Sequence, residues 1–150
     1  MPKLLWIVLV GSSLILTSFK SKPTPHAKSA TYDLRVDVSD IANNKGLIEF
    51  ALYKNPAVFT QAGKTHRLIR LDAHKSMVSY TFKDLEAGKY AVVVYHDENH
   101  NKICDKNFFG IPTEAYAFSN NMRPKLSAPS FEECAIKLQQ DRSIQIRMIY

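Results

Sequence analysis

An alternation of apolar and polar side chains, which begins at Thr31 and continues almost to the end of the chain, constrains the fold most strongly. Period-two alternation of this kind is typical of β-strands with one buried face. Residues 90–97 (YAVVVYHD) form the most apolar run and predict a central strand that is buried on both faces. The other predicted strands occupy residues 32–41, 47–54, 66–73, 76–85, 131–139 and 143–150, and the last two are expected to pair with each other.

The spacing of the turn signals predicts the fold class. About seven short strands separated by closely spaced turns, without a convincing helical period, predict a single all-β domain. The architecture that fits is a β-sandwich of immunoglobulin-like or transthyretin-like type. The sequence Asn-Asn-Lys-Gly at residues 43–46 predicts a hairpin between the first two strands.

The first thirty residues do not follow the strand pattern. Lys3 precedes an apolar run at residues 4–16, and small residues follow, which is the layout of a secretory signal peptide at residues 1–18. The run is shorter than the roughly 20 residues of a membrane-spanning helix, so membrane attachment is expected only through an uncleaved leader. Residues 19–30 are predicted to be a linker or the mature N-terminus, and residues 31–150 the β-sandwich domain. The protein is therefore predicted to be exported, to the periplasm or to the outside of the cell.

The positive charge of the chain belongs mostly to this leader. The formal net charge is +6, and four lysines but no acidic residue lie in residues 1–30, so 6 − 4 leaves +2 for residues 31–150. No basic stripe interleaved with aromatic residues is present, which argues against a nucleic-acid partner.

The two cysteines, Cys104 and Cys134, both follow the leader. An even pair without C-x-x-C spacing in an oxidising compartment favours a structural disulfide over a metal or redox site. We therefore predict a Cys104–Cys134 bridge, and free buried thiols are the alternative.

A polar loop is predicted directly after the central strand, in the sequence DENHNKICD at residues 97–105. Positions 1, 3, 5 and 9 of this loop carry side-chain oxygens, and position 7 could offer its backbone carbonyl. Calcium binds about six to eight oxygens, which alternate residues of a curled loop can supply. The predicted metal ligands are Asp97, Asn99, Asn101, Ile103 and Asp105.

The loop departs from a helix-loop-helix calcium site. Lys102 replaces the glycine of position 6, Phe108 replaces the glutamate of position 12, and no helix flanks the loop. Any calcium binding is therefore expected to be weak, with a dissociation constant of about 10⁻⁴ to 10⁻³ M. The alternative is that these side chains only form turns by accepting hydrogen bonds from nearby backbone amides.

A catalytic function is the second hypothesis, a secreted hydrolase that uses Asp97, His96 or Glu114. No complete catalytic constellation accompanies these residues: the sequence contains no G-x-S-x-G elbow and no phosphate-binding loop. His96 and His100 are four residues apart, but this spacing aligns side chains only on a helix, and His96 ends a predicted strand.

The segment that follows the loop is rich in aromatic residues. Exposed rings on a rigid loop would present a surface for a carbohydrate or peptide, because they give a large contact area at low entropic cost. The alternative is that the rings fold back and cover the open end of the sandwich. The residues of this predicted ligand surface are Phe109, Tyr116, Phe118 and Arg123.

Three stretches together resemble a known family: FKDLEAGKYAVVVYHDENHNKICDKNFFGIPTEAYAFSNN, PSFEECAIKL and the terminal IQIRMIY. They are similar to the domain-of-unknown-function family numbered 2141, which consists of exported bacterial proteins without an assigned activity. The resemblance covers roughly residues 31–150 and implies a small exported all-β domain, but no substrate.

Two non-enzymatic hypotheses therefore remain open. The first is an exported module that binds a carbohydrate, a peptide or an envelope protein at the loop of residues 95–130. The other is a structural accessory of an envelope assembly that uses an exposed sheet edge.

Overall fold

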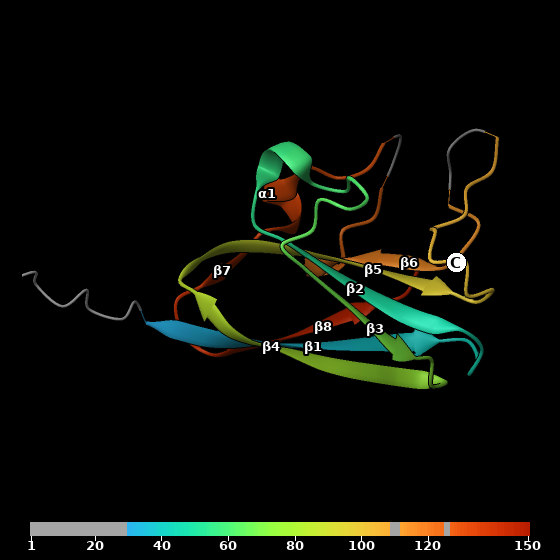
Figure 1. Ribbon diagram of the computed structural model, residues 1–150, viewed down its shortest axis with the longest axis horizontal. Coiled ribbons are helices and arrows are strands. Elements are labelled where there is room, and N and C mark those ends of the chain that lie inside the picture. The colour runs from blue at the N-terminus through green and yellow to red at the C-terminus, as the bar shows by residue number, and fades with distance from the viewer. Residues whose placement is uncertain (1–29, 109–111, 125–126) are drawn as a thin grey trace, which may run out of the picture.

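A computed structural model describes residues 30–108, 112–124 and 127–150. The predicted signal peptide and most of the predicted linker lie outside these ranges. The described chain is mostly β-structure and forms two sheets (Figure 1). Its elements are β1 (Thr31–Ile41), β2 (Leu47–Tyr53), η1 (Pro56–Val58), β3 (Arg67–Asp72), β4 (Ser76–Glu86), β5 (Gly88–Asp97), β6 (Tyr116–Phe118), η2 (Ser119–Asn121), α1 (Phe131–Cys134), β7 (Ile136–Leu138) and β8 (Arg142–Arg147).

The smaller sheet has the strand order β4-β1-β8, in which β1 and β4 are antiparallel and β1 and β8 are parallel. The larger sheet has the order β3-β2-β5-β6, and its pairs are all antiparallel. β7 pairs with the first residues of β5, on residues 88–90, whereas β6 pairs with residues 93–95. The prediction of an all-β domain is confirmed.

Alternating side chains from both sheets form one shared core. On β1, Leu34, Val36 and Val38 are completely buried, and on β2 the same holds for Phe50 and its neighbours on that face. Burying these side chains is the main stabilising contribution, at about 1.5–3 kcal/mol for each large aliphatic or aromatic residue.

The central strand is β5, as the sequence predicted, and it is buried on both faces. Val92 and Val94 point into the shared core. The opposite face packs under η1 and α1, which lie together on the outer side of the larger sheet (Figure 1). This outer cluster contains Ala51, Tyr53, Ala91, Phe118, Phe131 and Cys134.

Three local predictions are wrong. The turn at residues 43–46 does not form a hairpin, because β1 and β2 belong to different sheets and the turn carries the chain from one sheet to the other. The predicted final pair does not form either: β7 pairs with β5, and β8 pairs with β1.

The third error concerns residues 131–134, which form one turn of helix, α1, instead of a strand. The Ser130 side chain accepts a hydrogen bond from the Glu133 N–H, and the Glu133 carboxylate accepts one from the Ser130 N–H. This S-x-x-E capping box is readable in the sequence and stabilises the start of the helix. None of the helices in the described ranges is long and apolar enough to cross a membrane.

The end of the chain joins the two sheets. After β8, Ile149 pairs with Tyr116 of β6, with N···O distances of 3.1 and 2.8 Å. The C-terminus therefore lies beside the loop that follows β5 (Figure 1). We refer to this junction between β6, η2 and β8 as the seam.

Candidate functional site

The loop that follows β5 starts from a tightly packed base. Gly46 has φ +73°, and a Cβ atom at this position would lie 1.9 Å from the Asp97 carbonyl oxygen. The completely buried His96 donates a hydrogen bond from Nε2 to the Lys45 carbonyl at 2.6 Å. The turn of residues 43–46 is therefore fixed against the first residue of the loop.

The carboxylate of Asp97 holds the first part of the loop in a closed turn. Its side chain is 1% exposed, and its two oxygens accept hydrogen bonds from the N–H groups of Asn101 at 3.0 Å and Lys102 at 2.8 Å. Hydrogen bonds to a charged acceptor are stronger than neutral ones, so this contact stabilises the turn. Lys102 itself adopts φ 62°, which a non-glycine residue seldom does.

The other predicted ligands gather around Asp105. The amide nitrogens of Asn99 and Asn101 both donate to Oδ2 of Asp105, at 2.7 and 2.9 Å. The Asn101 side-chain oxygen accepts from the Ile103 N–H at 2.7 Å, and the Ile103 side chain is 63% exposed. The structure thus brings all five predicted metal-site residues into one hydrogen-bonded loop.

Glu114 closes the loop from its far end. Its two carboxylate oxygens accept hydrogen bonds from the N–H groups of Glu98 at 3.2 Å and Asp105 at 3.1 Å. Burial raises the pKa of Glu114, and the charges of Asp105 and Asp97 add to this effect, against the lowering by the two N–H groups. Among the described residues, no lysine or arginine forms an ion pair with Asp97, Asp105 or Glu114.

The side-chain oxygens of the loop are directed at backbone amides in this conformation. Within the described ranges, no group of three or more His, Cys, Asp or Glu side chains is arranged to hold a metal ion. The geometry is that of a turn stabilised by Asp and Asn side chains, which was the alternative interpretation of the sequence.

The three residues of the hydrolase hypothesis all have structural partners. Asp97 and Glu114 each use both oxygens for backbone N–H groups of the loop. His96 has no solvent exposure, and its Nδ1 lies 3.8 Å from Glu98 without forming a hydrogen bond. A general base must reach the proton of a substrate, and these groups are turned toward the protein itself.

Cys104 and Cys134 do not form the predicted disulfide in this structure, and both thiols are free. Cys134 lies in α1 and packs into the outer cluster with Phe118 and Phe131, and burial raises its pKa to about 12. Cys104 remains in the loop near Glu114, and burial raises its pKa as well. The one-turn helix at residues 131–134, which the strand prediction missed, carries Cys134 into this separate environment.

The predicted ligand surface is only partly exposed. Phe109 lies outside the described residues. Phe118 is 6% exposed and packs in the outer cluster, with Tyr116 partly buried against it. These two rings cover the outer face of the larger sheet, whereas the alternative interpretation placed them over the open end of the sandwich. Arg123 is exposed and lines a cavity of about 220 Å³ at the seam.

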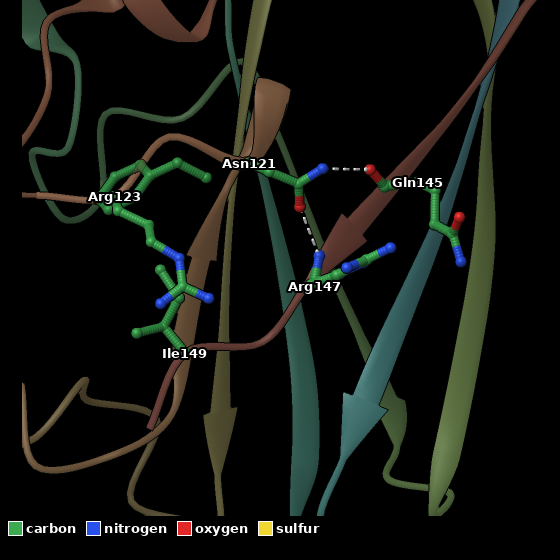
Figure 2. Close-up of a pocket in the computed structure, with 6 residues that line it drawn as sticks. Asn121, Arg123, Gln145, Arg147 and Ile149 are labelled. Carbon is green, nitrogen blue, oxygen red and sulfur yellow. Dashed lines mark hydrogen bonds between the residues drawn. The ribbon is translucent and has the colours of Figure 1, made fainter.

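Asn121 fixes one wall of this cavity (Figure 2). Its side chain donates to the Gln145 carbonyl at 3.2 Å and accepts from the Arg147 N–H at 2.8 Å, so one amide takes the place of a neighbouring strand on the edge of β8. Neither Asn121 nor Arg147 was predicted from the sequence as a site residue. The Ser-Asn-Asn sequence signals a turn, but its partners are more than twenty residues away and leave no local signal.

Ser119 and Asn120 make similar long-range contacts. The Ser119 hydroxyl accepts from the Val92 N–H at 3.0 Å and donates to the Cys134 carbonyl at 2.6 Å, at the point where the neighbour of β5 changes from β6 to β7. The Asn120 amide donates to the carbonyls of Glu133 at 3.0 Å and Ala135 at 3.1 Å. These side chains connect β5, α1 and β7.

Comparison with known proteins supports the family resemblance and adds no activity. No curated protein and no solved structure matches the chain. A family model described as "Uncharacterized protein conserved in bacteria (DUF2141)" matches residues 36–146, which is more than half of the sequence. The chain therefore belongs to the DUF2141 family.

Proposed function

We propose that the protein is an exported, non-enzymatic module, a sandwich of immunoglobulin-like or transthyretin-like type, whose loop of residues 97–114 binds calcium weakly. The calcium-supported loop presents a docking surface for a carbohydrate, a peptide or an envelope protein. The observation that carries the proposal is the presence of Asp97, Asp105 and Glu114 in one loop, without an ion pair to any lysine or arginine of the described chain.

The carboxylates repel one another, and the raised pKa of Glu114 reflects this repulsion in addition to burial. A divalent cation would remove the repulsion. Asp105 now receives two amide N–H donors, from Asn99 and Asn101. Rotation of these amides exchanges nitrogen for oxygen, so that the same side chains can supply ligands to calcium.

The docking surface is supported by apolar side chains on the same loop. Ile103 is 63% exposed and Phe108 is 97% exposed, and both are large hydrophobic residues. Exposed apolar side chains on a loop with a fixed backbone are typical of interaction sites. A loop held by calcium would keep these two side chains in position for a partner.

Calcium titration tests this proposal. With a dissociation constant of 10⁻⁴ to 10⁻³ M, 10 mM calcium should stabilise the folded state by about 1.4–2.7 kcal/mol, which raises the melting temperature by roughly 5–10 °C. The melting temperature should be measured in calcium, in magnesium and in chelator. Magnesium should have a much smaller effect, because it requires a rigid octahedral site.

Matched variants show whether the effect arises in the loop. Asp105→Asn should abolish the calcium response. Asp141→Asn, which removes a carboxylate near the N-terminal end of β1, where Asp141 accepts from the Asp33 N–H, should keep it. An equal melting temperature in calcium and in chelator for the wild-type protein would refute the calcium proposal.

The proposed export is tested separately. N-terminal sequencing of the protein recovered from the periplasm or the medium should begin after residue 18 if the leader is cleaved as proposed. Recovery of the uncleaved chain from the cytoplasmic fraction alone would contradict export.

A further inference from the structure

The cavity at the seam contains basic, amide and apolar side chains but no acidic one. Its volume is about 220 Å³, below the roughly 300–1,000 Å³ of cavities that bind drug-sized ligands, so it suits a small chemical group. The lining residues are Phe118, Asn121, Arg123, Gln145, Arg147 and Ile149.

The walls of the cavity are held by backbone contacts. Asn121 is bound to β8 through its side-chain amide, and Ile149 pairs with Tyr116 through two backbone hydrogen bonds. A site whose walls are fixed before binding loses little conformational entropy when a ligand enters.

The two arginines of the cavity are available to a ligand. Arg35 and Arg70 form ion pairs with Asp37 and Glu49, whereas in the described part of the chain neither Arg123 nor Arg147 has an acidic partner. In the view of Figure 2, the side chain of Arg123 extends toward Ile149. The side chain of Arg147 extends away from Arg123, beyond the hydrogen bond between the Asn121 side chain and the Arg147 N–H.

In this view, the cavity thus offers one cationic group that is directed toward an apolar side chain and a second cationic group that is directed elsewhere. The planar guanidinium of arginine matches a carboxylate through two parallel hydrogen bonds. Phe118 and Ile149 provide apolar contact for a short aliphatic group beside such a carboxylate.

We propose that this cavity binds the carboxylate of a small organic anion, with Arg123 as its direct partner and Arg147 as a source of additional positive potential. Two sources share this chemistry: a free aliphatic acid and the C-terminal carboxylate of a peptide that ends in a small apolar residue. The proposal concerns the seam and does not depend on calcium binding at the loop.

NMR titration of the full mature chain tests the proposal with three probes: isobutyrate, N-acetyl-alanyl-valine with a free carboxylate, and the C-terminal amide of the same dipeptide. We expect saturable shifts of the Asn121 side-chain amide and the Arg147 backbone amide with the free acids. Saturation by isobutyrate alone or by both acids supports a free aliphatic acid. Saturation by the dipeptide acid alone supports a peptide C-terminus.

Three arginine variants locate the site. Arg123→Gln should weaken binding of the acid about tenfold or more, and Arg147→Gln roughly threefold, because loss of a charged bidentate partner costs more than loss of a distant charge. The control is Arg142→Gln, which changes a residue on the same strand as Arg147 (β8) but outside the cavity, and this variant should bind the acid like the wild-type protein. Equal binding of the dipeptide amide, shifts that do not saturate, or an unchanged affinity of Arg123→Gln would overturn the proposal.

Discussion

The loop after β5 and the seam use the same side-chain chemistry in opposite ways. In the loop, Asn99 and Asn101 bond to residues two to six positions away. At the seam, Asn120 and Asn121 bond to residues 13 to 26 positions away, on other elements. The loop contacts shape one segment, whereas the seam contacts hold different parts of the fold together. A substitution at the seam should therefore affect the whole domain, and one within the loop only its surroundings.

The largest expected effect comes from Gly46→Ala, at the base of the loop. The new Cβ would overlap the backbone of Asp97 and Glu98, and the positive φ adds strain. We expect a loss of at least about 3 kcal/mol in the free energy of unfolding, measured by urea denaturation. Gly63→Ala is the control: Gly63 also has a positive φ, but a Cβ atom there meets no atom within 4 Å. The difference between the two variants therefore measures the cost of the overlap alone. Equal losses in the two variants would show that the packing at Gly46 is unimportant.

Ser119→Ala should cause the next-largest loss of unfolding free energy. It removes the partner of the Val92 N–H and of the Cys134 carbonyl in a buried environment. Each unsatisfied buried group costs about 1–3 kcal/mol, so for these two groups we expect a loss of at least roughly 2 kcal/mol of unfolding free energy. The control is Ser143→Ala, at an exposed position of β8, which should change stability by less than about 0.5 kcal/mol.

Asn121→Ala and Asn99→Ala compare the two regions directly. Asn121→Ala removes both contacts to β8 and should lower the unfolding free energy by about 1 kcal/mol. Asn99→Ala removes contacts within the loop and should lower it by less than about 0.5 kcal/mol. A larger loss for Asn99→Ala in the same denaturation experiment would show that the loop contacts stabilise the domain more than the seam contacts do.

The pH dependence of Glu114 should give a smaller effect. Its pKa is raised above the ordinary value of 4.5, so the folded state binds its proton more tightly than the unfolded state does. The stabilisation from this group is complete below pH 4.5 and is lost as the pH rises through the raised pKa. Relative to Glu114→Gln, the wild-type protein should become less stable over this interval in calcium-free denaturation curves. The opposite trend would contradict the crowding of carboxylates in the loop.

The cysteines should show the smallest effect. Because both thiols are free, the intact mass of the folded protein should not change on reduction. Cys134, whose pKa is raised to about 12, should react with a thiol reagent only after unfolding. A mass two hydrogens below that of the reduced chain would restore the predicted bridge.

The sequence predicted the parts of the structure that depend on local patterns. Alternation along residues 32–41 identified β1, because burial repeats every second residue in a strand with one buried face. The continuous apolar run of residues 90–97 identified the doubly buried β5. The alternating polar residues of the loop were recognised for a similar reason, since their partners lie within the same segment.

Sequence patterns did not determine which strands pair. Residues 43–46 have the composition of a hairpin turn, but the chain changes sheets there, and the buried faces of β1 and β2 meet across the core instead of lying side by side in one sheet. The contacts of Ser119 and Asn121 were also missed, because a polar side chain does not indicate which distant backbone group it will satisfy.

Calcium binding by the loop can be followed by hydrogen exchange of backbone amides with and without calcium. If the loop binds calcium, exchange should slow at Asn101 and Lys102, whose N–H groups bond to the Asp97 carboxylate. The Val92 N–H, which donates to the Ser119 hydroxyl, should become more protected only to the extent that calcium stabilises the whole domain. Unchanged exchange at these two loop amides in 10 mM calcium would contradict calcium binding by the loop.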